Sequence, residues 1–182
     1  MPKLSKPADR ICGSCLHGKQ ARASYKSKIY QSTSQPLELV HTNLCGPARV
    51  QTLQGERYFM LFIDDYTRII WVTFLKTKSE AFDKFKLFNA KVENESGHKI
   101  KCLRSDNGGE FVLTEFKNFC EQNGIKRKYY TSNTPQQNGI SETKNRIVQE
   151  ATRTMLLEAK QAETFWREAL AAAVYIIKIE LS

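Results

Sequence analysis

A carboxylate at the end of an apolar run constrains this chain more than any other feature. The run at 100–103 predicts a strand, and Asp106 follows it directly before a sharp Asn-Gly-Gly turn at 107–109. Glu142 comes 35 residues later (142 − 106 − 1), in what is expected to be the first turn of a helix. This interval is long enough for a helix and a short strand that return the chain to Asp106. Two carboxylates fixed on rigid elements can share divalent cations.

Three strands are predicted in succession before this motif. They are expected at 37–45, 57–64 and 69–76, and the last is rich in β-branched and aromatic residues. Short connections join them, and Gly46-Pro47 ends the first. Consecutive strands joined in this way form an antiparallel meander.

Helices and strands alternate after the meander. Thr77 and Glu80 match a capping box, and apolar residues at 81, 85, 88 and 92 predict one face of a helix that Gly97 ends. A strand at 99–105, a helix with an apolar stripe from Val112 to Cys120, and a short strand at 125–130 follow. This alternation favours parallel pairing with helices on the sheet. The predicted fold class is α/β, with a five-stranded mixed sheet (strands 1–3 antiparallel, strands 4 and 5 parallel) flanked by helices.

The two acidic motifs resemble those of retroviral-type integrase cores. SDNGGEF resembles the segment with the second acidic position of that family, and NGISETKNR the segment with the third. HTNLCGP and FIDDYTR resemble the copia-type retrotransposon branch, and the similarity runs from about Cys12 to Tyr175. The resemblance implies an RNase H-like fold and an Asp, Asp, Glu triad. The first acidic position of the triad falls at Asn43.

The resemblance also implies DNA polynucleotidyl transfer, in which water or a 3′ hydroxyl displaces one oxygen of a phosphodiester. Two Mg²⁺ or Mn²⁺ ions roughly 3.5–4 Å apart activate the attacking oxygen and stabilise the leaving one. Carboxylates are the hard ligands that such ions prefer. Asp106 and Glu142 would then be metal ligands, with Asn43 as a degenerate third. Because the amide removes one negative charge, the chain is expected to be weak or inactive as an integrase.

Asp64 and Asp65 are alternative candidates for the missing carboxylate. They end the strand next to the one that carries Asn43. Adjacent residues point to opposite faces of a strand, so at most one of them faces the metal side. The resemblance places FIDDYTR after the first catalytic strand, where an Asp is expected to pair with Arg68 or to cap the turn.

The net charge of +9, from 28 basic and 19 acidic residues, favours a polyanionic partner. On the helix after the polar loop 131–139, a row at steps of 4, 3 and 4 joins Glu142, Arg146, Gln149 and Arg153. A second row, Ile140, Ile147, Ala151 and Met155, is expected to face the core. Contacts with nucleic acid are predicted for Lys126, Arg127, Lys128, Gln137, Asn138, Lys144, Arg146 and Arg153; solvated or turn-forming polar residues are the alternative.

Three segments are expected. Residues 1–35 are a leader with a truncated zinc module, residues 36–160 the catalytic core, and residues 161–182 a helix packed on it. Cys12 and Cys15 supply two of the four ligands of a Zn²⁺ site, and the two upstream histidines of the family are absent, so zinc binding is expected to be lost. Two surface thiols are expected in place of an intact zinc site.

Five cysteines without an export signal indicate a reducing compartment, and the absence of an 18-residue apolar run argues against a membrane span. The resemblance implies a nuclear site of action, DNA ends and target DNA as partners, and a homo-oligomer in the full-length enzyme. Three functions stay open: an integrase core, a catalytically dead nucleic-acid-binding remnant, and an RNase H-like nuclease. A Mn²⁺ titration separates the first two, and a 3′ hydroxyl donor separates transfer from hydrolysis.

Overall fold

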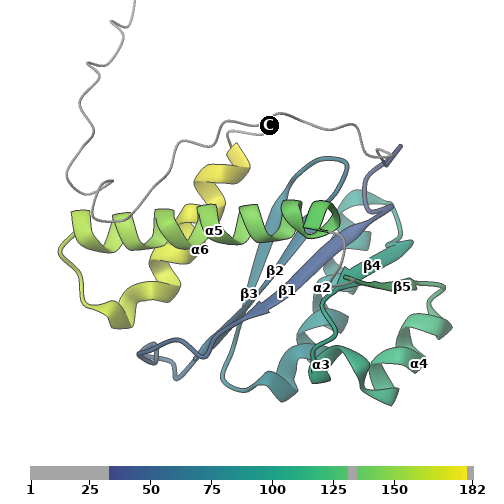
Figure 1. Ribbon diagram of the computed structural model, residues 1–182, viewed down its shortest axis with the longest axis horizontal. Coiled ribbons are helices and arrows are strands. Elements are labelled where there is room, and N and C mark those ends of the chain that lie inside the picture. Colours follow the sequence, from purple (N-terminus) through teal and green to yellow (C-terminus); the bar gives the residue numbers. More distant parts are fainter. Residues whose placement is uncertain (1–32, 131–134, 180–182) are drawn as a thin grey trace, which may run out of the picture.

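A five-stranded mixed sheet forms the centre of the computed structural model, which describes residues 33–130 and 135–179 (Figure 1). Its strand order is β3-β2-β1-β4-β5. The antiparallel strands are β1 (Val40–Cys45), β2 (Tyr58–Asp64) and β3 (Ile70–Leu75), and β4 (Cys102–Ser105) and β5 (Lys126–Tyr129) continue the sheet in parallel from β1. The predicted fold class and strand directions are therefore confirmed.

Each strand begins one to three residues later than predicted. At β1 the reason is local. Leu37 has a φ of 61°, which is incompatible with an extended strand, and its N–H bonds a carboxylate instead of a neighbouring strand. The chain enters β1 through a turn held by this carboxylate, which belongs to Asp64.

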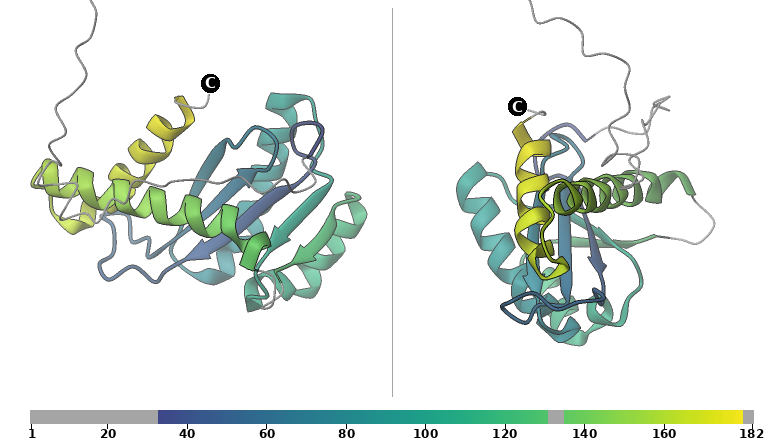
Figure 2. Two further views of the ribbon diagram at one scale, coloured as in Figure 1. Left: turned by 45° about the horizontal axis from the view of Figure 1, so that its top comes forward. Right: turned by 90° about the vertical axis from the view of Figure 1, so that its left-hand side faces the viewer.

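Helices cover both faces of the sheet (Figure 2). The α2 face carries α2 (Ala81–Ser96), α3 (Gly109–Val112) and α4 (Thr114–Gln122), and the α5 face carries α5 (Pro135–Glu158) and α6 (Trp166–Ile179). Two short 3-10 turns, η1 (Lys78–Glu80) and η2 (Glu163–Phe165), precede α2 and α6. Among the described helices, none combines the length and apolar character that crossing a membrane requires.

Phenylalanine rings fill the core on the α2 face. Phe85 is fully buried and stacks on Phe116, with ring centroids 4.9 Å apart. Phe62 of β2 stacks on Phe88 at 3.8 Å. The predicted inner face of α2 (81, 85, 88 and 92) is confirmed, because all four residues are buried. Gly97 ends the helix in the left-handed conformation, with a φ of 69°.

The helix starts differ from the prediction in two places. The capping box is wrong: η1 precedes α2, so Glu80 occupies the N-cap and accepts from the Lys76 N–H, and the Thr77 side chain makes no capping bond. The second predicted helix is two helices, because Leu113 has extended backbone angles between α3 and α4. This break leaves Val112 outside the core, with 48% of its surface exposed.

The predicted core row of α5 is largely wrong, although Ile140 packs against the core on the α5 face. Ile140, Ile147, Ala151 and Met155 are only half-buried, whereas the buried residues at regular steps are Ser141, Asn145, Val148 and Thr152. The cause is the position of α6. α5 packs mainly along α6 instead of lying flat on the sheet, so its apolar side is shared between two neighbours.

Candidate acidic site at the ends of three strands

The strand register brings Asn43 and Asp106 to the same end and the same face of the sheet. Val40 of β1 lies opposite Leu103 of the parallel strand β4, and both side chains pack in the core on the α2 face. Asn43 comes three residues after Val40, and Asp106 three residues after Leu103. Because side chains alternate between the faces, this odd offset puts both on the α5 face, where β4 has just ended.

The helix α5, which carries Glu142, passes across the end of β1: the Gln149 Nε2 lies 4.0 Å from the Cys45 Sγ. Burial, the largest cause, and the negative charges of Asp106 and Glu142 raise the pKa of Tyr130, the residue that follows β5, to about 12. Asn43 and Asp106 thus lie at one end of the sheet, on the face that α5 covers.

Asp106 is half-buried, and burial is the main reason that the pKa of its carboxyl is raised. The nearby Glu110 carboxylate raises it further, whereas the Gly108 N–H, which donates to Oδ1 at 3.2 Å, and the Lys78 charge lower it. A partly desolvated carboxylate beside a second one gains from any cation that binds it.

The possible metal ligands at this end of the sheet are hard oxygens, which suit Mg²⁺ or Mn²⁺. They are the carboxylates of Asp106 and Glu142 and the amide carbonyl of Asn43. Within residues 33–130 and 135–179, no three His, Cys, Asp or Glu side chains are grouped closely enough to hold a metal ion. Asn43 supplies an amide oxygen where a third carboxylate would complete such a group.

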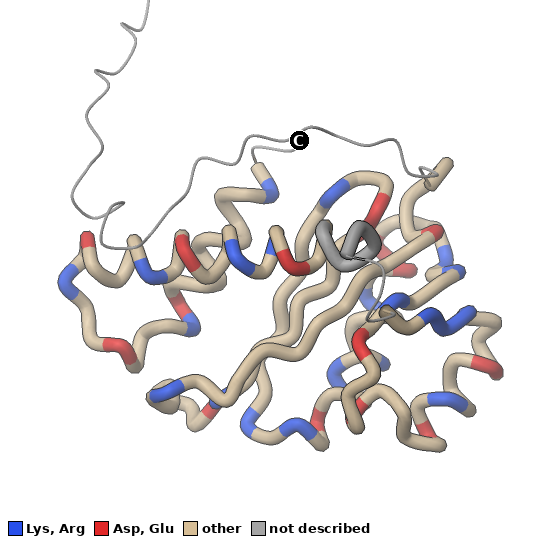
Figure 3. The backbone as a smooth tube through the Cα atoms, in the orientation of Figure 1, with Lys and Arg blue, Asp and Glu red and all other residues tan. Residues whose placement is uncertain are grey.

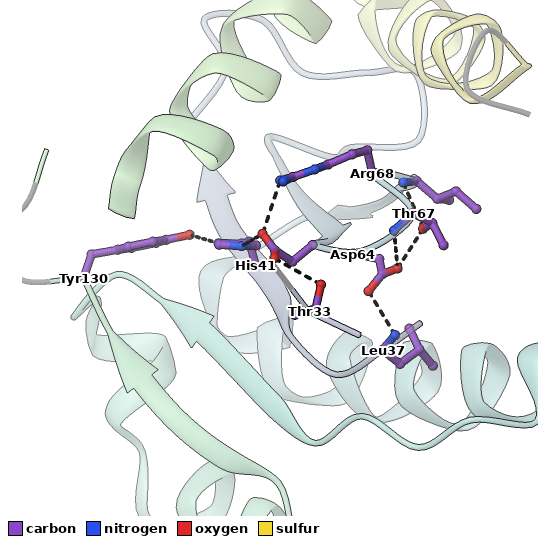
Figure 4. A network of polar contacts seen from close by, with 9 residues as sticks. Thr33, Leu37, His41, Asp64, Thr67, Arg68 and Tyr130 are labelled. Atoms are coloured by element: carbon purple, nitrogen blue, oxygen red, sulfur yellow. Dashed lines mark hydrogen bonds and ion pairs between the residues drawn. The ribbon is translucent and has the colours of Figure 1, made fainter. Parts of the chain in front are cut away.

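The carboxylate of Asp64 is hydrogen-bonded away from the end of the sheet where Asp106 lies (Figure 4). It is fully buried and accepts hydrogen bonds from the N–H of Leu37 at 2.9 Å, the N–H of Thr67 at 2.9 Å and the Thr67 hydroxyl at 2.7 Å. It lies opposite Val40. Asn43 is three residues further along β1, about 10 Å away at the usual rise of a strand.

Asp65 lies one residue beyond Asp64, further still from Asn43, and its carboxylate pairs with Arg68 at 3.2 Å and His41 at 3.1 Å. The roles predicted for this motif, pairing with Arg68 and capping the turn, are thus divided between the two residues. Neither carboxylate lies with Asp106.

The predicted basic cluster on β5 is divided between the two faces of the sheet. Arg127 lies on the α2 face, over the rings of Phe116 at 5.4 Å and Tyr129 at 5.2 Å. Lys126 and Lys128 are exposed and alternate with Arg127 along the strand, so they lie on the α5 face, as Asp106 does. Figure 3 shows Lys and Arg along β5, and both basic and acidic residues along α5.

Arg104 joins Lys126 and Lys128, although the sequence analysis missed it. It lies opposite Lys128 and is half-buried. Burial raises the pKa of the Cys102 thiol, and the charges of Lys128, Arg104 and Lys126 act in the opposite direction. The signal was available: Arg104 precedes Asp106 by two residues and therefore shares its face.

The other predicted contacts are distributed as follows. Arg146 and Arg153 are exposed on α5 together with Glu142, as their spacing predicted, and Lys144 is half-buried. The side chains of Gln137 and Asn138 and the half zinc site at Cys12 and Cys15 lie outside the described residues.

Comparison with known proteins gives the family. Residues 33–135 match the family described as Integrase core domain. The chain is 43% identical over 166 residues to the Retrovirus-related Pol polyprotein from transposon TNT 1-94 of Nicotiana tabacum, and 34% identical to that from transposon RE2 of Arabidopsis thaliana. Each match covers 91% of this chain, which spans 12% and 11% of the two polyproteins.

Two solved structures are similar in fold. The integrase catalytic core domain of HTLV-2 in complex with magnesium (trimeric form) has a TM-score of 0.56 at 18% identity, over 78% of this chain and 85% of that one. A chain of the simian T-cell lymphotropic virus intasome in complex with PP2A regulatory subunit B56 gamma has a TM-score of 0.63 at 16% identity, over 90% of this chain and 56% of that one.

The protein therefore belongs to the integrase core domain family, with the RNase H-like fold that the sequence predicted. Within that family its relatives are the Pol polyproteins of copia-type retrotransposons, the branch that HTNLCGP and FIDDYTR had indicated.

Proposed function

We propose that this chain is the catalytic core of a copia-type integrase whose polynucleotidyl-transfer site is impaired at Asn43. The observation that carries the proposal is the position of Asn43 and Asp106, three residues after the paired Val40 and Leu103 and on the same face of the sheet, in a chain that matches the integrase core domain family. DNA ends and target DNA are the proposed substrates, in a homo-oligomer of the full-length enzyme acting in the nucleus. The intasome and the magnesium-bound core among the structural relatives support this assignment.

In this proposal Asp106 and Glu142 would hold a divalent cation, with the Asn43 carbonyl as a third oxygen donor. A bound ion supplies positive charge for the attacking and leaving oxygens of a phosphodiester. The chain's own contribution is to position the DNA. Arg146 and Arg153 share the exposed row of Glu142 and hold phosphates beside the site, since their guanidinium groups suit phosphate oxygens.

The Asn43→Asp substitution tests the proposal. By isothermal titration, the parent chain is expected to bind at most one Mn²⁺ weakly, and Asn43→Asp is expected to bind two, because a carboxylate can bridge two ions and an amide cannot. Asn43→Asp combined with Asp106→Asn serves as the control and should return to weak binding. The proposal fails if Asn43→Asp gains no metal over the parent.

Activity separates the alternatives. In an otherwise complete integrase, Asn43→Asp should gain Mn²⁺-dependent joining of a 3′ hydroxyl end to target DNA. Asn43 itself favours the second candidate, a DNA-binding remnant without turnover, and unrestored joining despite restored metal binding would support that candidate. Cleavage by water alone, with no joining, would indicate a nuclease.

DNA binding should be salt-dependent through the cations on the α5 face. For duplex DNA, the slope of log K against log salt is expected to fall in magnitude by about 0.9 for each phosphate contact removed, so by about 2.7 when Arg104, Lys126 and Lys128 are all replaced by alanine. The control is Lys91→Ala on α2, whose side chain is 67% exposed on the opposite face. Fluorescence anisotropy at several salt concentrations measures the slope, and equal slopes in all proteins would remove this surface from the proposal.

A further inference from the structure

A series of side-chain hydrogen bonds crosses the sheet on the α5 face, from the end of β2 to the end of β5 (Figure 4). The His41 ring, fully buried in β1, has its Nε2 3.1 Å from Asp65 Oδ1 and its Nδ1 3.1 Å from the Tyr130 hydroxyl. The His41 and Tyr130 rings are nearly parallel, with centroids 6.3 Å apart. Asp65 is held in turn by Arg68 and, at 3.2 Å, by the Thr33 hydroxyl. The proposed polynucleotidyl-transfer chemistry uses none of these groups.

The direction of each hydrogen bond follows from the chemistry of its ends. Burial raises the pKa of Asp65, but the hydrogen bond from His41 and the charge of Arg68 outweigh it and the net pKa is lowered, so Asp65 is a carboxylate acceptor. The Nε2 of His41 must then carry the proton and donate. In a neutral ring the Nδ1 is left as an acceptor, and the Tyr130 O–H donates to it. Asp65 therefore fixes the tautomer of His41 that accepts from Tyr130.

The strand pairing that these bonds span is the shortest among the described strands of the sheet. β1 pairs with β2 at six positions but with β4 at two, and the pairing with β4 ends at His41 and Arg104. Asn43 and Asp106 lie two residues further along the two strands, past this last pair. The position of Asp106 relative to Asn43 therefore depends on what else connects the end of β4 to β1.

Tyr130 provides such a connection. Its backbone N–H donates to the Ser105 carbonyl at 3.0 Å, which attaches the end of β5 to the residue before Asp106. Ser105 is buried, and its hydroxyl donates to the Asp106 carbonyl at 2.9 Å, so the backbone at Asp106 is held at the same point. The Tyr130 hydroxyl reaches past β4 to His41. These bonds connect the end of β4 to β1 without using the ladder between the two strands.

We propose that His41 is a positioning residue: held by Asp65 and accepting from Tyr130, it fixes the end of β4 relative to β1 and so sets the distance between Asp106 and residue 43. The geometry of this connection does not depend on the proposed function, but its consequence, metal affinity, rests on that function. Without the His41–Tyr130 bond, the end of β4 is held to β1 by a ladder of two positions, and the strand ends that carry the two oxygen donors separate more readily.

Two substitutions break this bond and spare the one to Asp65. Tyr130→Phe removes the hydroxyl and keeps the ring, and His41→Gln keeps an N–H donor for Asp65 but loses the Nδ1 acceptor. In each variant, hydrogen exchange at the amide of residue 130, which donates to Ser105, is expected to become about tenfold faster, since local opening there is opposed by one buried hydrogen bond fewer. Exchange in the ladder between β1 and β2 should stay unchanged.

Tyr175→Phe is the matched control for the exchange experiment. This residue is 65% exposed on α6, so the loss of its hydroxyl should change nothing at residue 130. Unchanged exchange at residue 130 in both test variants, or an equal increase throughout the chain in Tyr130→Phe, would overturn the inference.

A double-mutant cycle measures the consequence for metal binding. In the Asn43→Asp background, Tyr130→Phe and His41→Gln are each expected to weaken Mn²⁺ binding about tenfold, the size typical of groups that orient metal ligands. Together they should weaken it no more than either does alone, because both remove the same bond. Additive effects would contradict the inference. If Asn43→Asp binds no metal, the proposed function fails, and the exchange experiment alone decides the role of His41.

Discussion

Replacing Phe85 by alanine is expected to lower the free energy of unfolding by about 3–5 kcal/mol. The ring is fully buried between the sheet and α4, stacked on Phe116 at 4.9 Å and 6.2 Å from Phe62, measured between ring centroids. Aromatic neighbours on several sides cannot all move inward, so most of the removed volume remains as a cavity.

Urea denaturation followed by circular dichroism measures this loss. Leu87→Ala is the control on the same helix: its side chain is 67% exposed, so the change is expected to stay within about 0.5 kcal/mol. A loss below about 1 kcal/mol for Phe85→Ala would mean that the core on the α2 face is not packed as described.

Replacing Asp64 by alanine is expected to cost about 3–5 kcal/mol of the free energy of unfolding. Its carboxylate satisfies the buried N–H of Leu37 and both the N–H and the hydroxyl of Thr67, and each donor left unpaired costs about 1–3 kcal/mol. The same bonds fix the turn from which β1 starts. The variant should therefore also lower DNA affinity, through misplacement of the strand that carries Asn43.

Asp83→Ala is the comparison for Asp64. The Asp83 side chain is 71% exposed and pairs with Lys86, so its loss is expected to cost less than about 0.5 kcal/mol. Asp64→Asn should lie between the two, since the amide oxygen still accepts. An Asp64→Ala variant as stable as the parent would show that other groups cap this turn.

The features that were predicted correctly from the sequence are those that depend on local pattern. Strand alternation and the apolar spacing of α2 are properties of neighbouring residues, and the antiparallel pairing of β1, β2 and β3 follows from the short connections between them. The inner row of α5 was wrong because the partner of that helix is α6, a non-local neighbour that the spacing within α5 does not reveal. The assignment of Asp106 and Glu142 as metal ligands stays a prediction that the Mn²⁺ titration tests.

Hydrogen bonds between side chains of different strands were not predicted. His41 of β1 is hydrogen-bonded to Asp65, at the end of β2, and to Tyr130, at the end of β5. These contacts can be foreseen only when the sheet order β2-β1-β4-β5 is known. Period-two alternation would have found Arg104, because it shares a face with Asp106. No comparable signal in one sequence joins His41 to Tyr130.

The sheet order also has a consequence for how copies of the protein behave at high concentration. β5 is an edge strand of four residues, and two of them are exposed lysines. A second chain that tried to extend the sheet along this edge would bring like charges together over a very short ladder, which natural sheets use as protection against fibre formation. The same lysines that are proposed to attract DNA therefore keep the protein from aggregating through its own backbone.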